Sequence, residues 1–220
     1  MQPFTAQKIS RVRKSDRAAY DSKSVFAILD EGLVGQVGFV AGNRPIVIPM
    51  IYARVGETVY LHGARATRFV KALRTGAPVC LGVTLVDGLV LARSAFHSSV
   101  NYRSVVLHGE AVETKDEAER EIALEAITNH LAPGRWDEVR PSTARELRAT
   151  SVLRMTIDAA SCKYRSGPPV DDEEDYDLPI WAGVIPFSAD AGAPQADDRL
   201  LPEVETPASV ARLVEIVNGR

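Results

Sequence analysis

The stretch with the clearest chemical potential is LHGARATRFVKAL, Leu61 to Leu73, where an apolar strand is expected to pass into a helix. Thr67 and Arg68 open the predicted helix, and Arg65 and Lys71 lie beside them. A helix N-terminus exposes unpaired N–H groups and carries a partial positive charge. A hydroxyl and several cations at such a point are typical of a site for a phosphate monoester. A solvated basic helix start without a ligand is the alternative, and these residues alone do not decide between the two.

A second polar stretch, ARSAFHSSVNYRSVVLHGEA, covers residues 92–111 between two expected strands. Few segments that only pack a core carry so many hydrogen-bonding side chains in so short a length. An imidazole titrates near neutral pH, so His97 is a candidate for substrate contact or proton transfer, and Tyr102 is a second candidate. A loop histidine held by a backbone carbonyl is the simpler alternative for His97.

Other common catalytic patterns are missing from the sequence. It holds no GxSxG elbow of a serine hydrolase, no Walker loop and no GxGxxG fingerprint. Its four histidines lack HExxH or similar spacing, so no metal site is predicted. His62, at the end of an expected strand, keeps haem ligation open as an alternative. The acidic run at residues 171–175 is expected to form an exposed loop.

The composition argues against several classes of protein. The formal net charge of -3 does not favour a general nucleic-acid binder. A membrane span needs a run of about 18 apolar residues, which the sequence does not contain, and the start of the chain lacks the apolar region of a secretory signal. Cys80 and Cys162 lie in apolar, strand-like contexts without CxxC spacing. Both are interpreted as reduced core residues, and the protein is expected to be cytoplasmic.

Short strands separated by turn residues dominate the pattern. Strands are expected at residues 37–40, 46–52, 58–62, 79–86, 89–92, 104–113, 151–158, 162–166 and 181–186. Pro49 lies inside one of these strands, which indicates a sheet edge, a bulge or an opening in the sheet. Asp87-Gly88 is typical of a hairpin turn.

The expected helices are few and lie between groups of strands. They are a short helix from Asp21-Ser22 to Gly32 and further helices at 67–74, 115–131, 142–150 (with Ser142 as its cap) and 208–217. Because strands and helices do not alternate, we predict a mainly β, antiparallel barrel with peripheral helices rather than a doubly wound sheet. Residues 1–21 are assigned to a lead-in, 22–200 to the barrel domain and 201–220 to a tail with a short helix.

Three strings in this order resemble the pyridoxamine 5'-phosphate oxidase family of flavin-binding split-barrel proteins. They are IVIPMIYARVGETVYLHGARATR, SAFHSSVNYRSVVLHGEA and WAGVIP, and the similarity covers about residues 22–200. It is strongest with the flavin-nucleotide-binding branch that includes nitroimidazole-resistance proteins. The resemblance implies an antiparallel split β-barrel that forms a homodimer with FMN at the subunit interface. Some relatives bind haem, so haem is the alternative cofactor.

The resemblance also implies a set of flavin contacts. One strand is expected to run along the isoalloxazine ring, and the start of the following helix to bind the ribityl phosphate. Ser104 stands where the oxidase carries a glutamine that contacts FMN, and Trp181 matches a tryptophan that reaches the flavin. The expected contact residues are Ile48, Pro49, Met50, Ile51, Tyr52, His62, Gly63, Arg65, Thr67, Arg68, Lys71, Ser104 and Trp181.

The sequence departs from the oxidase where that enzyme holds its substrate. The family's C-terminal Arg-x-His-x-Arg string is absent, and only Asp198-Arg199-Leu200 remains. Vitamin B6 phosphate is therefore not expected as the substrate. The leading hypothesis is an FMN-dependent oxidoreductase acting on an unidentified small molecule. The alternatives are a flavin or haem carrier or sensor without turnover, and a purely structural dimer.

Overall fold

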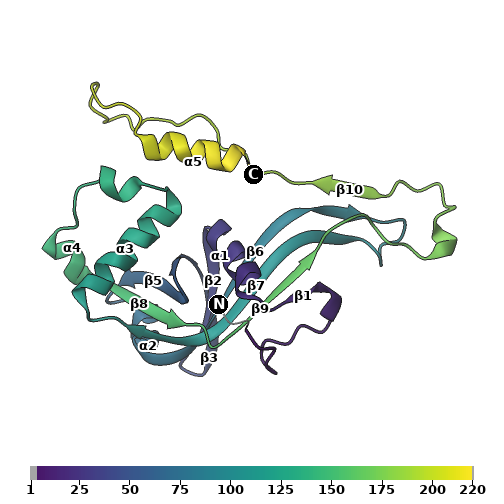
Figure 1. Ribbon diagram of the computed structural model, residues 1–220, viewed down its shortest axis with the longest axis horizontal. Helices are drawn as coiled ribbons and strands as arrows, with labels where there is room; N and C mark the ends of the chain where they lie inside the picture. Colours follow the sequence, from purple (N-terminus) through teal and green to yellow (C-terminus); the bar gives the residue numbers. More distant parts are fainter. Residues whose placement is uncertain (1–3, 220) are drawn as a thin grey trace.

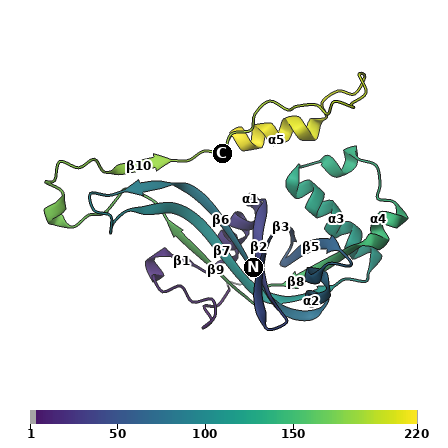
Figure 2. The same cartoon turned by 180° about the vertical axis from the view of Figure 1, so that it is seen from behind.

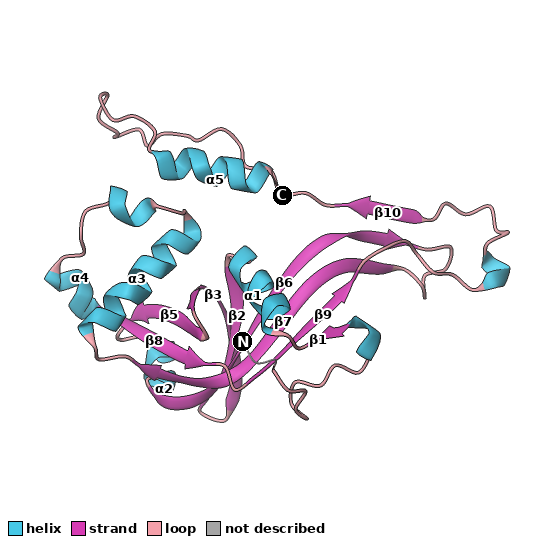
Figure 3. Ribbon diagram, viewed as in Figure 1, coloured by secondary structure: helices cyan, strands magenta, loops and turns pink. Residues whose placement is uncertain are grey.

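A curled antiparallel sheet dominates the computed structural model, which describes residues 4–219 (Figures 1 and 3). Its strands are β1 Ala18–Ala19, β2 Val34–Ala41, β3 Arg44–Ile51, β4 Ala53–Val55, β5 Thr58–Ala64, β6 Thr75–Leu91, β7 Ser99–Glu113, β8 Thr150–Thr156, β9 Ala159–Arg165 and β10 Gly183–Pro186. The helices are α1 Ser22–Glu31, α2 Arg68–Leu73, α3 Glu117–Leu131, α4 Ala144–Ala149 and α5 Ala208–Asn218, with 3-10 turns η1 Ser15–Arg17, η2 Arg135–Glu138 and η3 Glu173–Asp175. The predicted mainly β, antiparallel architecture is confirmed.

The strands follow the order β3-β2-β6-β7-β8-β5-β4, with β9 and β10 paired beside this path. β6 and β7 are the longest strands and pair with each other along nearly their whole length. The ends of the two strands and the turn between them, residues 86–102, leave the barrel and are called the hairpin arm below (Figure 2). β10 pairs with the β6 side of this arm, and β9 pairs with β7.

The core lies inside the curled sheet and is built by alternate residues of its strands. Fully buried examples are Val37, Leu81, Leu107 and Leu153. Successive side chains of a strand point to opposite faces of the sheet, so every second residue enters the core. Helix α2 adds its apolar face, Phe69, Val70 and Leu73, to the same core. A smaller cluster beneath α3 joins Ala123 and Ile127 to Tyr60 and Val152.

Side-chain caps fix where several helices begin. Asp21 accepts a hydrogen bond from the backbone N–H of Ser24, as the sequence predicted for α1. Asp116 caps α3 through the N–H groups of Ala118 and Glu119. Caps of this kind satisfy N–H groups that have no partner inside the helix.

Three local predictions were wrong. Asp87-Gly88 is not a hairpin turn, because β6 continues through it with a register shift between Val86 and Gly88. A bulge lets the strand bend without reversing. The cap of α4 is Thr143 rather than Ser142, because Thr143 forms a reciprocal capping box with Glu146. The acidic run begins with the buried Asp171 and is not wholly exposed.

Within residues 4–219, no helix combines the length and the apolar character needed to cross a bilayer.

Candidate functional site

The start of α2 lies directly after β5 and presents the residues predicted to bind phosphate. Thr67 is the N-cap: its hydroxyl accepts from the N–H of Val70 at 3.4 Å and donates to the carbonyl of Ala64 at 2.8 Å. The hydroxyl proton of Thr67 is therefore already donated to the Ala64 carbonyl. A direct hydrogen bond from Thr67 to a phosphate would require this bond to Ala64 to break. In this conformation Thr67 shapes the helix start and the cations around it supply the charge.

Three exposed cations surround this N-cap. None of Arg65, Arg68 and Lys71 forms an ion pair with any residue in the described part of the chain. The first N–H groups of the helix point the same way as its positive dipole end. Gly63 lets β5 pack closely against α2, since a Cβ there would meet Cγ2 of the buried Val70 at 3.3 Å. The arrangement fits a dianionic phosphate ester.

His62 lies on β5 just before this turn and is half-buried. Its Nδ1 is buried and has no hydrogen-bond partner in the described residues. Burial lowers the pKa of His62 from its ordinary value of 6.5, so the neutral ring is the favoured form near neutral pH. An unsatisfied buried nitrogen costs about 1–3 kcal/mol. This cost makes His62 a candidate for a partner that the described residues do not supply.

β3 forms one edge of the sheet, which is one of the three arrangements that Pro49 indicated. Its register places Pro45 opposite Val40 and Pro49 opposite Gln36, and β2 is the strand that β3 pairs with in the described chain. Proline has no N–H to give to a ladder. Because alternate residues of an antiparallel strand bond to the same neighbour, residues 45, 47, 49 and 51 turn their backbone groups to the free edge.

The free edge of β3 is therefore rich in acceptors and poor in donors. It offers four carbonyl groups but N–H groups only from Val47 and Ile51. The side chains of Val47 and Pro49 point outward and are exposed, whereas Ile48 and Met50 pack against the core. Pro45 and Val47 share this edge with Pro49 and Ile51 of the predicted contact range 48–52, and the alternation of β-branched residues with prolines was a signal for them.

Tyr52 follows the end of β3 and its side chain does not face this edge. The ring is fully buried, and the hydroxyl donates to the carbonyl of Leu29 at 2.7 Å. Burial raises the pKa of Tyr52 well above its usual range, so it stays protonated. Its side chain is a core residue that ties β3 to α1.

An open groove of about 590 Å³ runs along the outer sheet face beside β3. Val47, Gly38, Cys80 and His108 lie in one cross-strand row and all line it. The row is flat at Gly38, where an added Cβ would meet the Cys80 sulfur at 2.6 Å. The groove offers a planar ligand an apolar surface next to the acceptor-rich edge of β3.

The two candidate catalytic residues lie on the hairpin arm, away from this groove. His97 is in the turn at the tip, and its Nε2 lies 3.2 Å from Oδ2 of Asp172. Tyr102 stands opposite Arg165 on β9, with the Lys163 ammonium 5.9 Å from its ring. Within one chain, neither residue meets the start of α2.

Ser104 and Trp181 are also separated from the start of α2. Ser104 lies on the outer face of β7 and donates its hydroxyl proton to the carbonyl of Lys163 at 3.0 Å. Trp181 is 65% exposed and packs beside Gly183 at the start of β10. Figures 1 and 2 both place β10 along the arm and α2 at the opposite end of the barrel. A single chain does not unite the predicted contacts.

Comparison with known proteins identifies the family. A family model described as pyridoxamine 5'-phosphate oxidase matches residues 21–164. The chain belongs to the pyridoxamine 5'-phosphate oxidase family. The resemblance inferred from the three sequence strings is confirmed by this match. No curated protein matches the chain.

Two solved structures are similar to this family member over nearly the whole chain. The flavocytochrome Anf3 from Azotobacter vinelandii is 42% identical, with a TM-score of 0.89 and coverage of 96% of this chain and 98% of that chain. The FAD and heme binding protein from Mycobacterium smegmatis is 35% identical, with a TM-score of 0.85 and coverage of 90% and 97%. A Bacteroides thetaiotaomicron protein assigned to 5-nitroimidazole antibiotic resistance shares the fold, at 21% identity, a TM-score of 0.57 and coverage of 66% and 85%.

In this family member, the sequence did not predict an ion-pair cluster of Arg103, Asp87 and Glu31, called the clamp below. It lies where the hairpin arm joins the barrel. Arg103 donates to Asp87 and also to Glu31 of α1. The hydrogen bonds to Asp87, followed by those to Glu31, raise the pKa of Arg103. The signal was Asp87 itself, which the hairpin interpretation had assigned to a turn. The clamp fixes the root of the arm against α1, on the face of β7 opposite to Ser104.

Proposed function

We propose that the protein is a flavin-binding redox protein of the pyridoxamine 5'-phosphate oxidase family, and that it also binds haem. The observation that carries the flavin assignment is the set of cations Arg65, Arg68 and Lys71 at the start of α2, none of which forms an ion pair in the described residues. The open edge of β3 is the second feature that supports it. The two full-length structural neighbours, a flavocytochrome and an FAD and heme binding protein, support the pairing of flavin with haem.

The phosphate of the flavin's ribityl chain would bind at the start of α2. Arg68 and Arg65 supply charge-assisted donors, and the first-turn N–H groups supply further ones. FMN carries this phosphate as a monoester, whereas in FAD it is part of a diphosphate. FMN was the choice from sequence, and the neighbour from Mycobacterium smegmatis binds FAD. The two flavins differ in mass, which separates them in the experiment below.

The ring would lie over the outer groove beside β3. Val47 and Pro45 offer apolar contact, and the backbone groups at the free edge of β3 would face the ring's polar rim. A flavin supplies hydride or single-electron transfer when it is bound. The chain's own residues bind the phosphate, orient the ring and shield one of its faces from water.

A homodimer completes the site in this proposal. Trp181 and the candidate residues His97 and Tyr102 lie on or beside the hairpin arm, far from the start of α2 in the same chain. An arm from a second copy would bring them to the groove. Exposed apolar side chains along the arm, such as Phe96 at 89% and Val86 at 49%, fit burial against another copy.

His62 is the proposed haem ligand. Its neutral ring and its buried nitrogen without a partner fit a side chain that gains a metal or a hydrogen-bond partner from outside the chain. In this role His62 would hold the iron, and β5 would link that histidine to the phosphate-binding turn a few residues later.

The spectrum of the purified protein tests the proposal. We expect flavin bands and a Soret band, with the flavin released on denaturation and identified by mass. Addition of NADH or NADPH in air then separates an oxidoreductase, which reduces its flavin over many turnovers, from a carrier or sensor, which does not. A colourless protein without saturable binding of added FMN, FAD or haem contradicts the proposal.

A further inference from the structure

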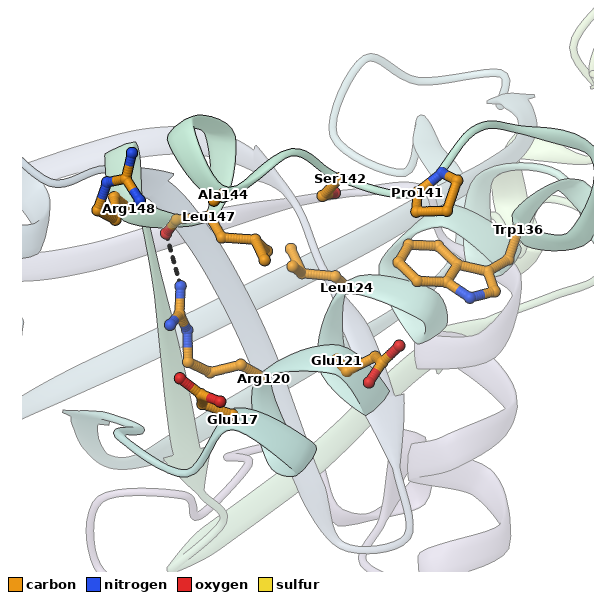
Figure 4. A pocket seen from close by; sticks show the side chains of 10 residues that line it. All are labelled: Glu117, Arg120, Glu121, Leu124, Trp136, Pro141, Ser142, Ala144, Leu147 and Arg148. Atoms are coloured by element: carbon orange, nitrogen blue, oxygen red, sulfur yellow. Dashed lines mark hydrogen bonds between the residues drawn. The ribbon is translucent and has the colours of Figure 1, made fainter.

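A second cavity lies between α3 and α4, in a part of the molecule that the flavin proposal does not use. It has a volume of about 380 Å³, within the range of small-molecule sites in proteins. We call it the α3–α4 cleft. Its walls are Leu124 of α3, Leu147 of α4, Trp136 of η2 and Pro141 of the connecting loop (Figure 4).

Hydrogen bonds across the α3–α4 cleft hold its walls in place. The guanidinium of Arg120 donates to the carbonyls of Leu147 at 2.7 Å and Thr150 at 3.2 Å, which ties α3 to α4. The backbone N–H of Trp136 donates to Oδ1 of Asn129 at 3.0 Å. Because these bonds exist before any ligand arrives, little ordering is needed on binding.

The connection between η2 and α4, residues 139–143, is also held in place by hydrogen bonds. Arg140 forms a two-pronged pair with Glu146, at 2.9 and 2.5 Å, and Glu146 closes the capping box of α4 with Thr143. These bonds set the position of Pro141 and of the first turn of α4. The α3–α4 cleft is thus bounded by defined elements on both sides.

Opposite charges lie at the two ends of the α3–α4 cleft. Figure 4 shows Arg120 and Arg148 at one end, with Glu117 beside Arg120, and the Glu121 carboxylate toward Trp136 at the other end. In the described residues, neither Glu121 nor Arg148 forms a hydrogen bond or an ion pair with its side chain. The apolar pair Leu124 and Leu147 separates the two ends.

We infer that the α3–α4 cleft binds a small planar aromatic zwitterion. The ring lies between Trp136 and the two leucines, where an indole stacks well on another ring. The anionic end meets Arg148, and the cationic end meets Glu121 and the face of Trp136, which together favour a cation. A ligand that lacks either charge leaves one end of the cleft without a partner.

The probe for the test is 4-(aminomethyl)benzoate, which carries an ammonium group and a carboxylate at opposite ends of one ring. We expect saturable binding to the full chain by calorimetry, with 4-methylbenzoate and the methyl ester of the probe binding more weakly. Glu121→Gln and Arg148→Gln should each weaken probe binding about fivefold or more, the effect of a partly exposed ion pair.

Two exposed residues on the same helices provide matched controls. Glu125→Gln on α3 and Arg145→Gln on α4 change the same charges, but neither residue lines the α3–α4 cleft. Both controls should leave probe affinity unchanged. Circular dichroism of each variant checks that the fold is retained.

The two tryptophans of the chain locate the bound probe. In an NMR titration, the indole N–H signal lost in Trp136→Phe should be the one that shifts, while the signal of Trp181 stays in place. The inference is overturned by the absence of saturation, by equal effects of the cleft and control variants, or by a shift of the Trp181 signal alone.

Discussion

Arg93 holds the buried carboxylate of Asp171 from two directions. The backbone N–H of Arg93 donates to Oδ1 at 2.9 Å, and its guanidinium donates to Oδ2 at 3.1 Å. The Asp171 side chain is 0% exposed. The same guanidinium lies 4.9 Å from the ring centroid of Tyr176. This pair fastens the acidic segment that follows β9 to the tip of the hairpin arm.

Arg93→Ala should destabilise the protein by roughly 3 kcal/mol, because it leaves the Asp171 carboxylate buried without its counter-charge. Equilibrium urea unfolding measures the change. Glu174→Gln, an exposed change in the same acidic segment, is the control and should stay within about 0.5 kcal/mol of the parent. Equal unfolding midpoints for the parent and Arg93→Ala would contradict the anchoring role.

Arg68→Ala should weaken flavin binding about tenfold, or about 1.4 kcal/mol, through the loss of one charge-assisted contact to phosphate. Fluorescence titration of the flavin-free protein with FMN measures the affinity. Arg74→Ala removes the same charge at the other end of α2 and should bind FMN like the parent. If Arg74→Ala weakens binding as much as Arg68→Ala, general electrostatic attraction explains the result and the phosphate assignment is wrong.

His62 should make stability depend on pH. Because burial lowers its pKa below 6.5, the unfolded chain binds a proton first as the pH falls. The haem-free protein should therefore lose stability below about pH 6.5, with the loss complete only at the lower folded-state pKa. His62→Gln should show a smaller loss between pH 7.5 and pH 5 in urea unfolding. An unchanged pH dependence in the variant would argue that His62 has a solvent-like environment.

Tyr52→Phe should destabilise the protein by about 1–2 kcal/mol, since the buried carbonyl of Leu29 loses its hydroxyl donor. Thermal and urea unfolding of the flavin-free protein measure this effect. Tyr164→Phe, at a residue that is 41% exposed, is the matched control and should be nearly neutral. Flavin affinity should stay unchanged in both variants, because the Tyr52 ring points away from the groove.

Local signals in the sequence predicted much of the fold. Pro49 indicated an edge strand, and β3 pairs with β2 along one side. Asp21 predicted the start of α1, where its carboxylate accepts from Ser24. These predictions rest on the proline ring and on a cap side chain, and both act within a few residues of the chain.

The failed predictions depend on contacts between distant segments. Asp87-Gly88 favours a turn locally, but Arg103 holds Asp87 within a continuous strand. The acidic run has the composition of a solvated loop, yet Asp171 is buried because Arg93 lies 78 positions away in the chain and beside it in space. The assembly of a flavin site from two copies likewise stays a prediction, because no local pattern specifies which surfaces meet.

The two prolines of β3 have a further consequence for the behaviour of the protein in a crowded solution. An uncovered strand invites other chains to add to it and can seed fibrils or amorphous precipitate. Pro45 and Pro49 have no backbone N–H, so the free edge of β3 lacks a regular series of hydrogen-bond donors. A strand of another chain therefore pairs poorly with it. The same two prolines thus limit uncontrolled strand addition to this edge in a newly made chain.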